Sequence, residues 1–364
     1  MEAIRFNEKL TSKERVLATF AHCNTDRVPV NYSFNPGVDD RLKKALGLKH
    51  NDNEGLMEYL GVDFRGIWVP YTGPRLHKEI LSRGVDPEWG FHTRWVEHDT
   101  GGYWDYCDYP LMFAEEDEVA SWPMPSPDDY DYNVITETVQ KHEGKALYFG
   151  DAGLGCIINT AGFFRGMEQV FIDLATDEPA GLLLIDRFLD LHFERMVRAL
   201  DKIGKKIDFV WMGEDLGTQI GPMISKELFR KHILPRHKRF LDLATSYNLP
   251  VMLHTCGSSS WSYEDYISIG LKAVDTLQPE AANMSPTYLK QQFGGQLVFH
   301  GCISTTGVLS FGSKEDTIND VKNTLDIMMP GGGYCLAPTH CLQDNTPTEN
   351  VFAMYETAHR FGRY

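Results

Sequence analysis

Residues 250–257 read Pro250-Val251-Met252-Leu253-His254-Thr255-Cys256-Gly257. A short apolar run between two chain-breaking residues is typical of a strand that is covered on both faces. Side chains two residues apart along a strand point to the same face, so His254 and Cys256 project together from its carboxyl end. Imidazole nitrogen and thiolate sulfur are both zinc donors. The stretch therefore predicts a buried strand with two candidate zinc ligands, and a buried but non-ligating His and Cys is the alternative.

Similar strands recur along the chain and alternate with amphipathic helices. Further strands are predicted at 27–34, 61–70, 147–151, 208–215, 273–277, 297–300 and 334–337. Helices are predicted within 1–24 and at 39–46, 54–60, 166–176, 178–203, 225–243, 263–269, 285–293, 313–329 and 346–361. About eight strand–helix units predict an α/β fold with a parallel sheet, closed as a (β/α)8 TIM barrel whose active site lies at the carboxyl ends of the strands.

Composition excludes several classes of protein. The 364 residues are 42% hydrophobic and 24% charged, which is ordinary for a globular chain. A formal charge of −16 repels phosphate backbones, so we expect no nucleic acid partner. We find no apolar run long enough to span a membrane, and residues 1–8 lack the apolar core of a signal peptide. With seven scattered cysteines and no small-domain disulfide pattern, the sequence predicts a cytoplasmic protein with reduced thiols.

Residues 71–145 depart from this regular pattern. They are rich in Trp, Tyr, Asp, Gly and Pro, and residues 94–98 alternate in the manner of a strand. We expect one barrel domain over residues 1–364, with 71–145 as an insertion or lid. Such an insertion either covers a pocket or forms a surface hairpin with its own small aromatic cluster.

Polar side chains gather where the predicted strands end. These are Asn31, Tyr32, Asp151, Glu214, Asp215, His254, Cys256, Glu280, His300, Cys302, His340 and Cys341. In a barrel they meet at one mouth. His340 and Cys341 are adjacent, so only one of them is expected to face a metal held by His254 and Cys256. Glu280 is a further candidate ligand, because zinc also accepts carboxylates.

Three stretches resemble the uroporphyrinogen decarboxylase superfamily, which includes zinc-dependent, corrinoid-linked methyltransferases. They are residues 213–217 (Gly-Glu-Asp-Leu-Gly), residues 254–257 (His-Thr-Cys-Gly) and residues 337–350 (Ala-Pro-Thr-His-Cys-Leu-Gln-Asp-Asn-Thr-Pro-Thr-Glu-Asn). The resemblance covers residues 150–364 well and 11–70 weakly. It implies a (β/α)8 barrel, in agreement with the pattern of strands and helices.

Two stretches separate the chain from the decarboxylases of this superfamily. Decarboxylases carry a segment of the form M-R-Q-A-G-R at the first strand, whereas residues 31–37 contain no arginine. The decarboxylase segment F-S-D-I-L-V corresponds to residues 64–69, where Gly66 replaces the acid. A tetra-anionic macrocycle needs such cations and that acid. The methyltransferase branch carries H-x-C and a later cysteine as zinc ligands, and the later position falls on His340 or on Cys341 beside it.

The resemblance thus implies a zinc-dependent methyltransferase. It would move a methyl group between a small methylated compound, such as an aromatic methyl ether in O-demethylation, and a corrinoid (cobalamin) carried on a partner protein. Glu214 and Asp151 are the candidate catalytic acid/base residues, and the candidate substrate-binding residues are Asn31, Tyr32, Trp211 and His300. A metal-free decarboxylase and a non-catalytic zinc- or corrinoid-binding protein are the alternatives. A homodimer is compatible with the resemblance.

Overall fold

A parallel sheet of seven strands forms the centre of the molecule, which we describe from a computed structural model covering residues 8–98 and 101–364. The strands are neighbours in chain order, and every pair is parallel. They are β1 (Phe64–Ile67), β5 (Ala146–Gly150), β6 (Phe209–Gly213), β7 (Val251–Thr255), β8 (Ala273–Thr276), β9 (Val298–Ile303) and β10 (Tyr334–Pro338). Parallel neighbours need crossover connections, which here contain helices.

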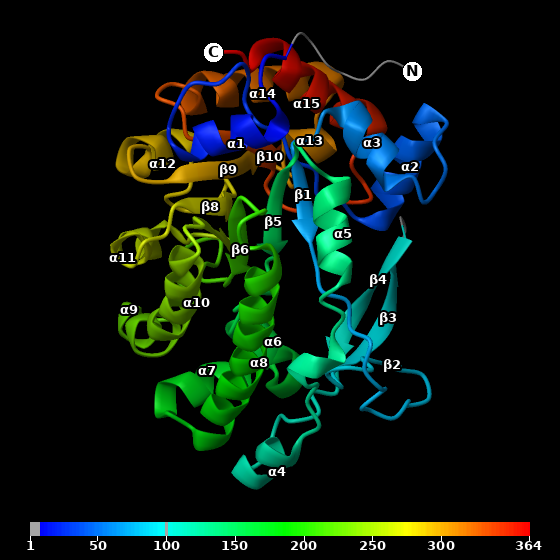
Figure 1. Ribbon diagram of the computed structural model, residues 1–364, viewed down its shortest axis with the longest axis vertical. Coiled ribbons are helices and arrows are strands. Elements are labelled where there is room, and N and C mark those ends of the chain that lie inside the picture. The colour runs from blue at the N-terminus through cyan, green and yellow to red at the C-terminus, as the bar shows by residue number, and fades with distance from the viewer. Residues whose placement is uncertain (1–7, 99–100) are drawn as a thin grey trace.

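The helices lie outside the curled sheet (Figure 1). Before β1 these are α1 (Ser12–Phe20), α2 (Pro36–Leu46) and α3 (Asn53–Leu60). After β5 they are α6 (Ile158–Arg165), α7 (Met167–Thr176), α8 (Pro179–Ile203), α9 (Lys226–Leu228), α10 (Leu234–Ser246), α11 (Tyr263–Ser268), α12 (Pro286–Phe293), α13 (Val308–Phe311), α14 (Lys314–Met328) and α15 (Thr348–Phe361). Within residues 8–98 and 101–364, no helix combines the length and the apolar character that crossing a membrane requires.

Side-chain caps begin several of the helices where the sequence predicts a start. The Thr11 hydroxyl accepts from the N–H of Glu14, and the Glu14 carboxylate accepts from the N–H of Thr11. Ser225, Ser285 and Ser313 likewise accept backbone N–H bonds at the starts of α9, α12 and α14. The predicted helix 225–243 is interrupted by a π-helical turn over Phe229–Ile233, which lies just before Pro235. Proline lacks the N–H of a regular helix, which accounts for the interruption there.

The predicted first strand, 27–34, does not form a ladder in the structure. Val30 makes an isolated bridge with Leu336 of β10, and the N–H of Asp63, just before β1, donates to the Val30 carbonyl at 3.0 Å. The N–H of Leu336 donates to the Pro29 carbonyl at 2.8 Å. Because Pro29 has no N–H, it cannot continue the ladder. The prediction of a parallel α/β sheet is confirmed, but the described strands form a curled sheet of seven, and residues 29–31 join its edge strands β1 and β10. Phe34 makes a further isolated bridge with Leu342, after β10.

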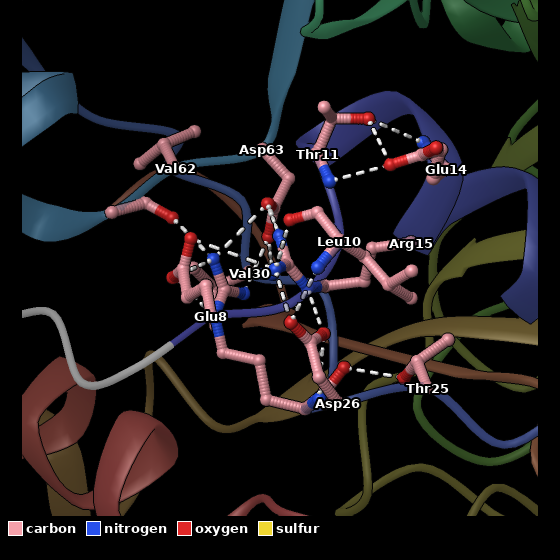
Figure 2. A network of polar contacts seen from close by, with 12 residues as sticks. Glu8, Leu10, Thr11, Glu14, Arg15, Thr25, Asp26, Val30, Val62 and Asp63 are labelled. Atoms are coloured by element: carbon pink, nitrogen blue, oxygen red, sulfur yellow. Dashed lines mark hydrogen bonds and ion pairs between the residues drawn. The ribbon is translucent and has the colours of Figure 1, made fainter.

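A buried ion network holds this seam at the amino-terminal end of the strands (Figure 2). The fully buried Asp63 carboxylate lies 2.7 Å from Nη1 of Arg15 and 2.7 Å from Nη1 of Arg27, and it accepts the N–H of Val30 at 2.8 Å. Burial alone would raise the pKa of Asp63, but the two guanidinium groups hold it below its usual range. Arg15 also pairs with Asp26 at 2.7 Å. The network therefore ties α1, the 27–30 segment and the start of β1 together.

The inner face of the sheet is filled at the same end. Val16 and Phe20 of α1 pack against inward-facing residues of the strands, among them Phe64, Phe209 and Met252. α1 contacts β5 and β10, and Figure 1 shows it at the end of the sheet opposite the β2–β4 insertion. With this end closed by apolar side chains, space remains at the carboxyl ends of the strands.

The aromatic-rich region 71–145 forms a separate small sheet. It is antiparallel in the order β2 (Gly84–Val85), β3 (His92–His98), β4 (Gly101–Cys107), and it is followed by α4 (Glu116–Ser121), a 3₁₀ turn (Pro127–Asp129) and α5 (Val134–Lys141). The predicted strand at 94–98 is part of β3. Of the predicted N-terminal helix, α1 is present from Ser12, while residues 1–7 and the predictions made on them lie outside the described residues.

Candidate metal centre and its cavity

Three side chains form a row across the inner face of the sheet. His254 on β7, Asp275 on β8 and His300 on β9 are register partners, so their side chains point in the same direction. Asp275 Oδ2 lies 2.7 Å from Nδ1 of His254, and its Oδ1 lies 2.6 Å from Nδ1 of His300. Burial alone would raise the pKa of Asp275, but the two imidazoles hold it well below its usual range. One buried carboxylate therefore orients both rings.

His254, Cys256 and His340 form the cluster of metal-ligand type. One donor atom from each lies within 4.8 Å of the others. Since Nδ1 of His254 faces Asp275, its Nε2 is turned toward Cys256, whose Sγ lies 3.4 Å away. His340 follows β10 by two residues, and its ring lies 5.7 Å from that of His254 between centroids. The two strand ends thus bring together three donors that are distant in sequence.

Two of the predicted ligands lie outside this cluster. Cys341 is not part of the cluster, but it lies beside it: its Sγ is 3.1 Å from Oγ of Ser33, and its side chain also hydrogen-bonds to His340. Glu280 is exposed and accepts a hydrogen bond from the Ser304 hydroxyl. Of the adjacent pair at 340–341, the structure thus brings His340 to the other two donors and places Cys341 beside Ser33.

The donor set fits zinc. Two imidazole nitrogens and one sulfur are zinc donors, and a carboxylate behind a ligating imidazole is the common outer partner. Burial raises the pKa of the Cys256 thiol to about 11. Hydrogen bonding to Cys256 raises the pKa of His340 to about 10. A bound zinc ion would keep the Cys256 sulfur as thiolate despite this burial, because a coordinated thiol is deprotonated.

The loop after β7 is fixed by contacts that the sequence did not single out. Asp215 accepts the N–H of Cys256 at 2.9 Å, and its other oxygen accepts from Nδ2 of Asn159 at 2.7 Å. Gly257 has φ +67°, and a Cβ there would meet the Gly217 carbonyl oxygen at 2.2 Å. Only glycine suits both this conformation and this approach. Asp215 therefore positions Cys256, and Gly257 lets the two loops meet.

A cavity of about 260 Å³ opens beside the cluster. The predicted residues Asn31, Tyr32, Asp151, Trp211 and His300 line it together with His254, His340 and Cys341. Nδ2 of Asn31 lies 3.0 Å from Nε2 of His300. The Tyr32 hydroxyl is turned toward Asp39, at 3.1 Å. Nε1 of Trp211 is buried and has no hydrogen-bond partner among the described residues, so it is a donor without an acceptor.

Glu214, the other predicted catalytic acid, lies away from this cavity. Its side chain is 0% exposed, and its oxygens accept the N–H groups of Ile157 and Ile158 at 2.8 and 3.0 Å. Nε2 of His237 lies 3.4 Å from it. Both carboxylate oxygens are thus committed to the start of α6, where they bind otherwise unpaired amides. The structure gives Glu214 a position that holds α6 rather than one that reaches a ligand in the cavity.

Asp275 is the site residue that the sequence did not reveal. It lies inside an apolar strand, Ala273–Thr276, and no motif marks it. The only signal is a charged residue within a buried strand, since a buried carboxylate must find partners. The identity of those partners depends on strand register, which puts Asp275 opposite both His254 and His300.

Comparison with known proteins shows what part of this chain resembles. The family model for uroporphyrinogen decarboxylase (URO-D) matches residues 184–361. Curated proteins give no significant match. The structure of a methyltransferase from Methanosarcina mazei is similar with a TM-score of 0.62 and 20% identity over 97% of this chain and 99% of that chain, which shows a shared fold.

A Penicillium canescens endo-1,4-beta-xylanase, XylE, is similar only with a TM-score of 0.41 and 7% identity over 66% of this chain and 82% of that one, too slight a likeness to support any inference. The family match spans β6 to β10 and thus includes His254, Cys256 and His340. Residues 184–361, just under half of the chain, are therefore similar to the uroporphyrinogen decarboxylase family.

Proposed function

We propose that this protein is a zinc-dependent methyltransferase that moves a methyl group between a small methylated compound and a corrinoid carried on a separate protein. The observation that carries the proposal is the cluster of His254, Cys256 and His340, which opens on a cavity and has Asp275 behind it. The methyltransferase of similar fold supports the reaction class. An aromatic methyl ether is the substrate that the aromatic walls of the cavity favour.

His254, Cys256 and His340 would hold the metal. Zinc bound there would act as a Lewis acid on an ether oxygen or hold a thiol acceptor as thiolate. Asp275 accepts the Nδ1 proton of His254 and so keeps its Nε2 directed at Cys256. Three protein donors leave one position for a substrate, which distinguishes a catalytic site from the closed four-ligand shell of a non-catalytic zinc protein.

The remaining cavity residues would orient the substrate. Tyr148 and Trp211 meet edge to face, with ring centroids 5.1 Å apart, and form one wall. The unpaired N–H of Trp211 can donate to a substrate oxygen. Asp151, which lines the cavity and is exposed, has a carboxylate that can accept a proton from an incoming thiol or hydroxyl. We assign this role to Asp151 and not to Glu214, whose oxygens are both occupied.

The composition of the cavity wall disfavours the decarboxylase alternative. Among the described residues that line it, none is Arg or Lys. A macrocycle with several carboxylates would bring its charges into the cavity without cations to pair with them, and buried unpaired charges are costly. Metal content separates the two readings further, because the decarboxylase alternative is metal-free.

We also infer that residues 29–31 serve as the eighth strand of a (β/α)8 barrel. Their backbone bonds to Leu336 and Asp63 are the support for this inference. The whole chain, 1–364, would then be a single domain in which 71–145 acts as a lid. Residues 86–91 of this region line a second cavity near the first, which supports the lid role.

The decisive experiment pairs metal analysis with a methyl-transfer assay. Inductively coupled plasma mass spectrometry measures the metal content of wild type and of the His254→Ala/Cys256→Ala double variant. The matched control is Cys23→Ala, because Cys23 is an exposed cysteine outside the cluster. We expect about one zinc per chain in wild type and control, as in catalytic sites with three protein ligands, and none in the double variant. Transfer from methoxybenzenes to reduced cobalamin is followed by the change in corrinoid absorbance. A folded wild type without zinc would overturn the proposal.

A further inference from the structure

A second chamber of about 340 Å³ lies next to the cavity of the metal cluster. Its wall comes from the ends of β1 and β5, from α6 and α8, and from residues 86–91 of the aromatic-rich region. Trp68 and Asp151 line both the chamber and the cavity, so the two spaces adjoin at these side chains. Trp68 is 54% exposed, which leaves its indole available to a ligand that extends from one space into the other.

The chamber has rigid aromatic walls. Phe91 lies 5.7 Å from Phe163 between ring centroids, and Phe163 is stacked on Tyr106 at 3.6 Å. Trp89 stands edge-on to His192 at 5.5 Å. Side chains held by one another in this way offer flat apolar surfaces with little conformational freedom to lose. Aromatic rings are the groups that such surfaces accommodate best.

α8 contributes the cationic side of the chamber. His192 and Arg195 are three residues apart and therefore lie on the same face of the helix. The guanidinium carbon of Arg195 lies 4.0 Å from the centroid of the Tyr130 ring, which holds the group in place. Its Nε is buried without a hydrogen-bond partner, and no ion pair joins Arg195 to an acid among the described residues. A buried donor that lacks a partner calls for an acceptor.

His192 adds a second donor. Its Nδ1 accepts the N–H of Gly155 at 3.4 Å, so its proton resides on Nε2. Burial lowers the pKa of His192 to about 3, and the ring is therefore neutral at physiological pH. The cationic side of the chamber thus consists of one fixed guanidinium and one neutral donor.

The acidic residues of the chamber already have donors of their own. Asp86 accepts the N–H groups of Glu88 and Trp89, at 3.0 and 2.7 Å. Glu88 accepts from the Tyr130 hydroxyl. Asp151 accepts the N–H of Gly153 at 2.7 Å. Arg195 acts on the charge of Glu88 across the chamber, but among the described residues its buried Nε has no hydrogen-bond partner, so this N–H remains open to an acceptor of a ligand.

We propose that the second chamber binds the carboxylate end of a small aromatic acid, with the carboxylate on Arg195 and the ring against Trp89 and Phe91. The methoxy group of the same molecule lies in the neighbouring cavity beside His254. This inference rests on the proposed methyl transfer and names the substrate class: methoxylated benzoates. Guanidinium and carboxylate match in shape as well as charge, which gives the site its selectivity.

The test measures binding separately from turnover. Isothermal titration calorimetry compares 4-methoxybenzoate with its neutral analogue 4-methoxybenzamide on the full-length, zinc-loaded protein. We expect the acid to bind wild type at least about tenfold more tightly than the amide, as one charge-assisted hydrogen bond implies. Arg195→Gln should abolish this preference, and Arg195→Lys should keep part of it. Arg198→Gln is the matched control, because Arg198 lies on the same helix and pairs at the surface with Asp128 and Glu194.

Each outcome separates this inference from the proposed function. Equal affinity for acid and amide in wild type would overturn the carboxylate site even if every arginine variant failed to fold. A preference that survives in Arg195→Gln would overturn the role of Arg195. Tight, Arg195-dependent binding without any methyl transfer would leave the chamber assigned and the methyltransferase proposal refuted. Transfer from uncharged methoxybenzenes at the same kcat/KM as from methoxybenzoates would support the methyltransferase proposal and refute the carboxylate site.

Discussion

The carboxylate of Asp275 lies 2.7 Å from Nδ1 of His254, on the far side of the ring from Cys256. The pair extends to a third residue, because the same carboxylate binds His300 at 2.6 Å. The orientation of the His254 ring is therefore set by a residue that takes no part in the cluster. Under the proposed function, the affinity for zinc would depend on a neighbouring strand.

Asp275→Asn should weaken zinc binding without removing it. An amide cannot accept the imidazole proton as strongly as a carboxylate, so the ring loses both orientation and basicity. Loss of such an outer partner lowers metal affinity by about 10–100-fold. Competition with a chromophoric chelator measures this change, with Asp40→Asn, an exposed acid that pairs with His50, as the control. Unchanged affinity in Asp275→Asn would show that His254 is oriented by other contacts, such as the Thr276 hydroxyl at 2.9 Å.

His340→Ala and Cys341→Ala should have opposite effects on metal content. His340 shares the cluster with His254 and Cys256, whereas Cys341 faces Ser33. We expect zinc to be lost from His340→Ala and retained by Cys341→Ala. Metal analysis after dialysis against a weak chelator distinguishes the two variants. The reverse result would mean that the 339–341 turn rearranges when zinc binds, so that sulfur replaces imidazole.

Glu214→Gln should lower stability and leave the zinc content unchanged. The glutamine side chain keeps one acceptor oxygen for the two amides of Ile157 and Ile158, so one buried N–H loses its partner. Such a loss costs about 1–3 kcal/mol of unfolding free energy. Chemical denaturation gives the change in stability, and metal analysis gives the zinc content. A variant with wild-type stability that no longer transfers methyl groups would instead make Glu214 a catalytic acid.

Asp63→Asn should destabilise the protein most at neutral pH. The pKa of Asp63 is lower in the folded state than its usual value, so its ionised form stabilises the fold above the unfolded pKa of about 4. That contribution is lost as the pH falls through the lower, folded pKa. Removing one partner of a buried pair costs about 3–5 kcal/mol. Unfolding free energies of wild type and variant should therefore differ by about this amount at neutral pH and converge in acid, and a pH-independent difference would contradict the assignment.

Much of the fold follows from local patterns. Apolar runs bounded by Pro and Gly predicted β7, and Thr11, Ser225, Ser285 and Ser313 predicted helix starts because a hydroxyl there satisfies an exposed N–H. The prediction of a first strand at 27–34 is wrong, because this segment makes isolated bridges and no ladder. Its residues favour an extended backbone, but Pro29 has no N–H to donate to a neighbouring strand. How few backbone hydrogen bonds the segment makes depends on tertiary contacts.

The site was predictable where it depends on strand ends and hidden where it depends on register. His254 lies near the end of β7, Cys256 follows it and His340 follows β10, so the three meet at one edge of a parallel sheet. Asp275 and the choice between His340 and Cys341 depend on which residues lie opposite each other on neighbouring strands, and on the path of a turn. Neither leaves a local trace in the sequence.

The seam between residues 29–31 and β10 has a consequence for folding during synthesis. The bridge of Val30 can form only after Leu336, near the other end of the chain, has been synthesised. Contacts between such distant residues form late, because a long loop has to close first. The contacts of Asp63 with Arg15 and Arg27 join residues that are close in the sequence, so they can form before that bridge does. The ion network at the seam would hold the amino-terminal segment of the nascent chain beside the start of β1 until β10 has been synthesised.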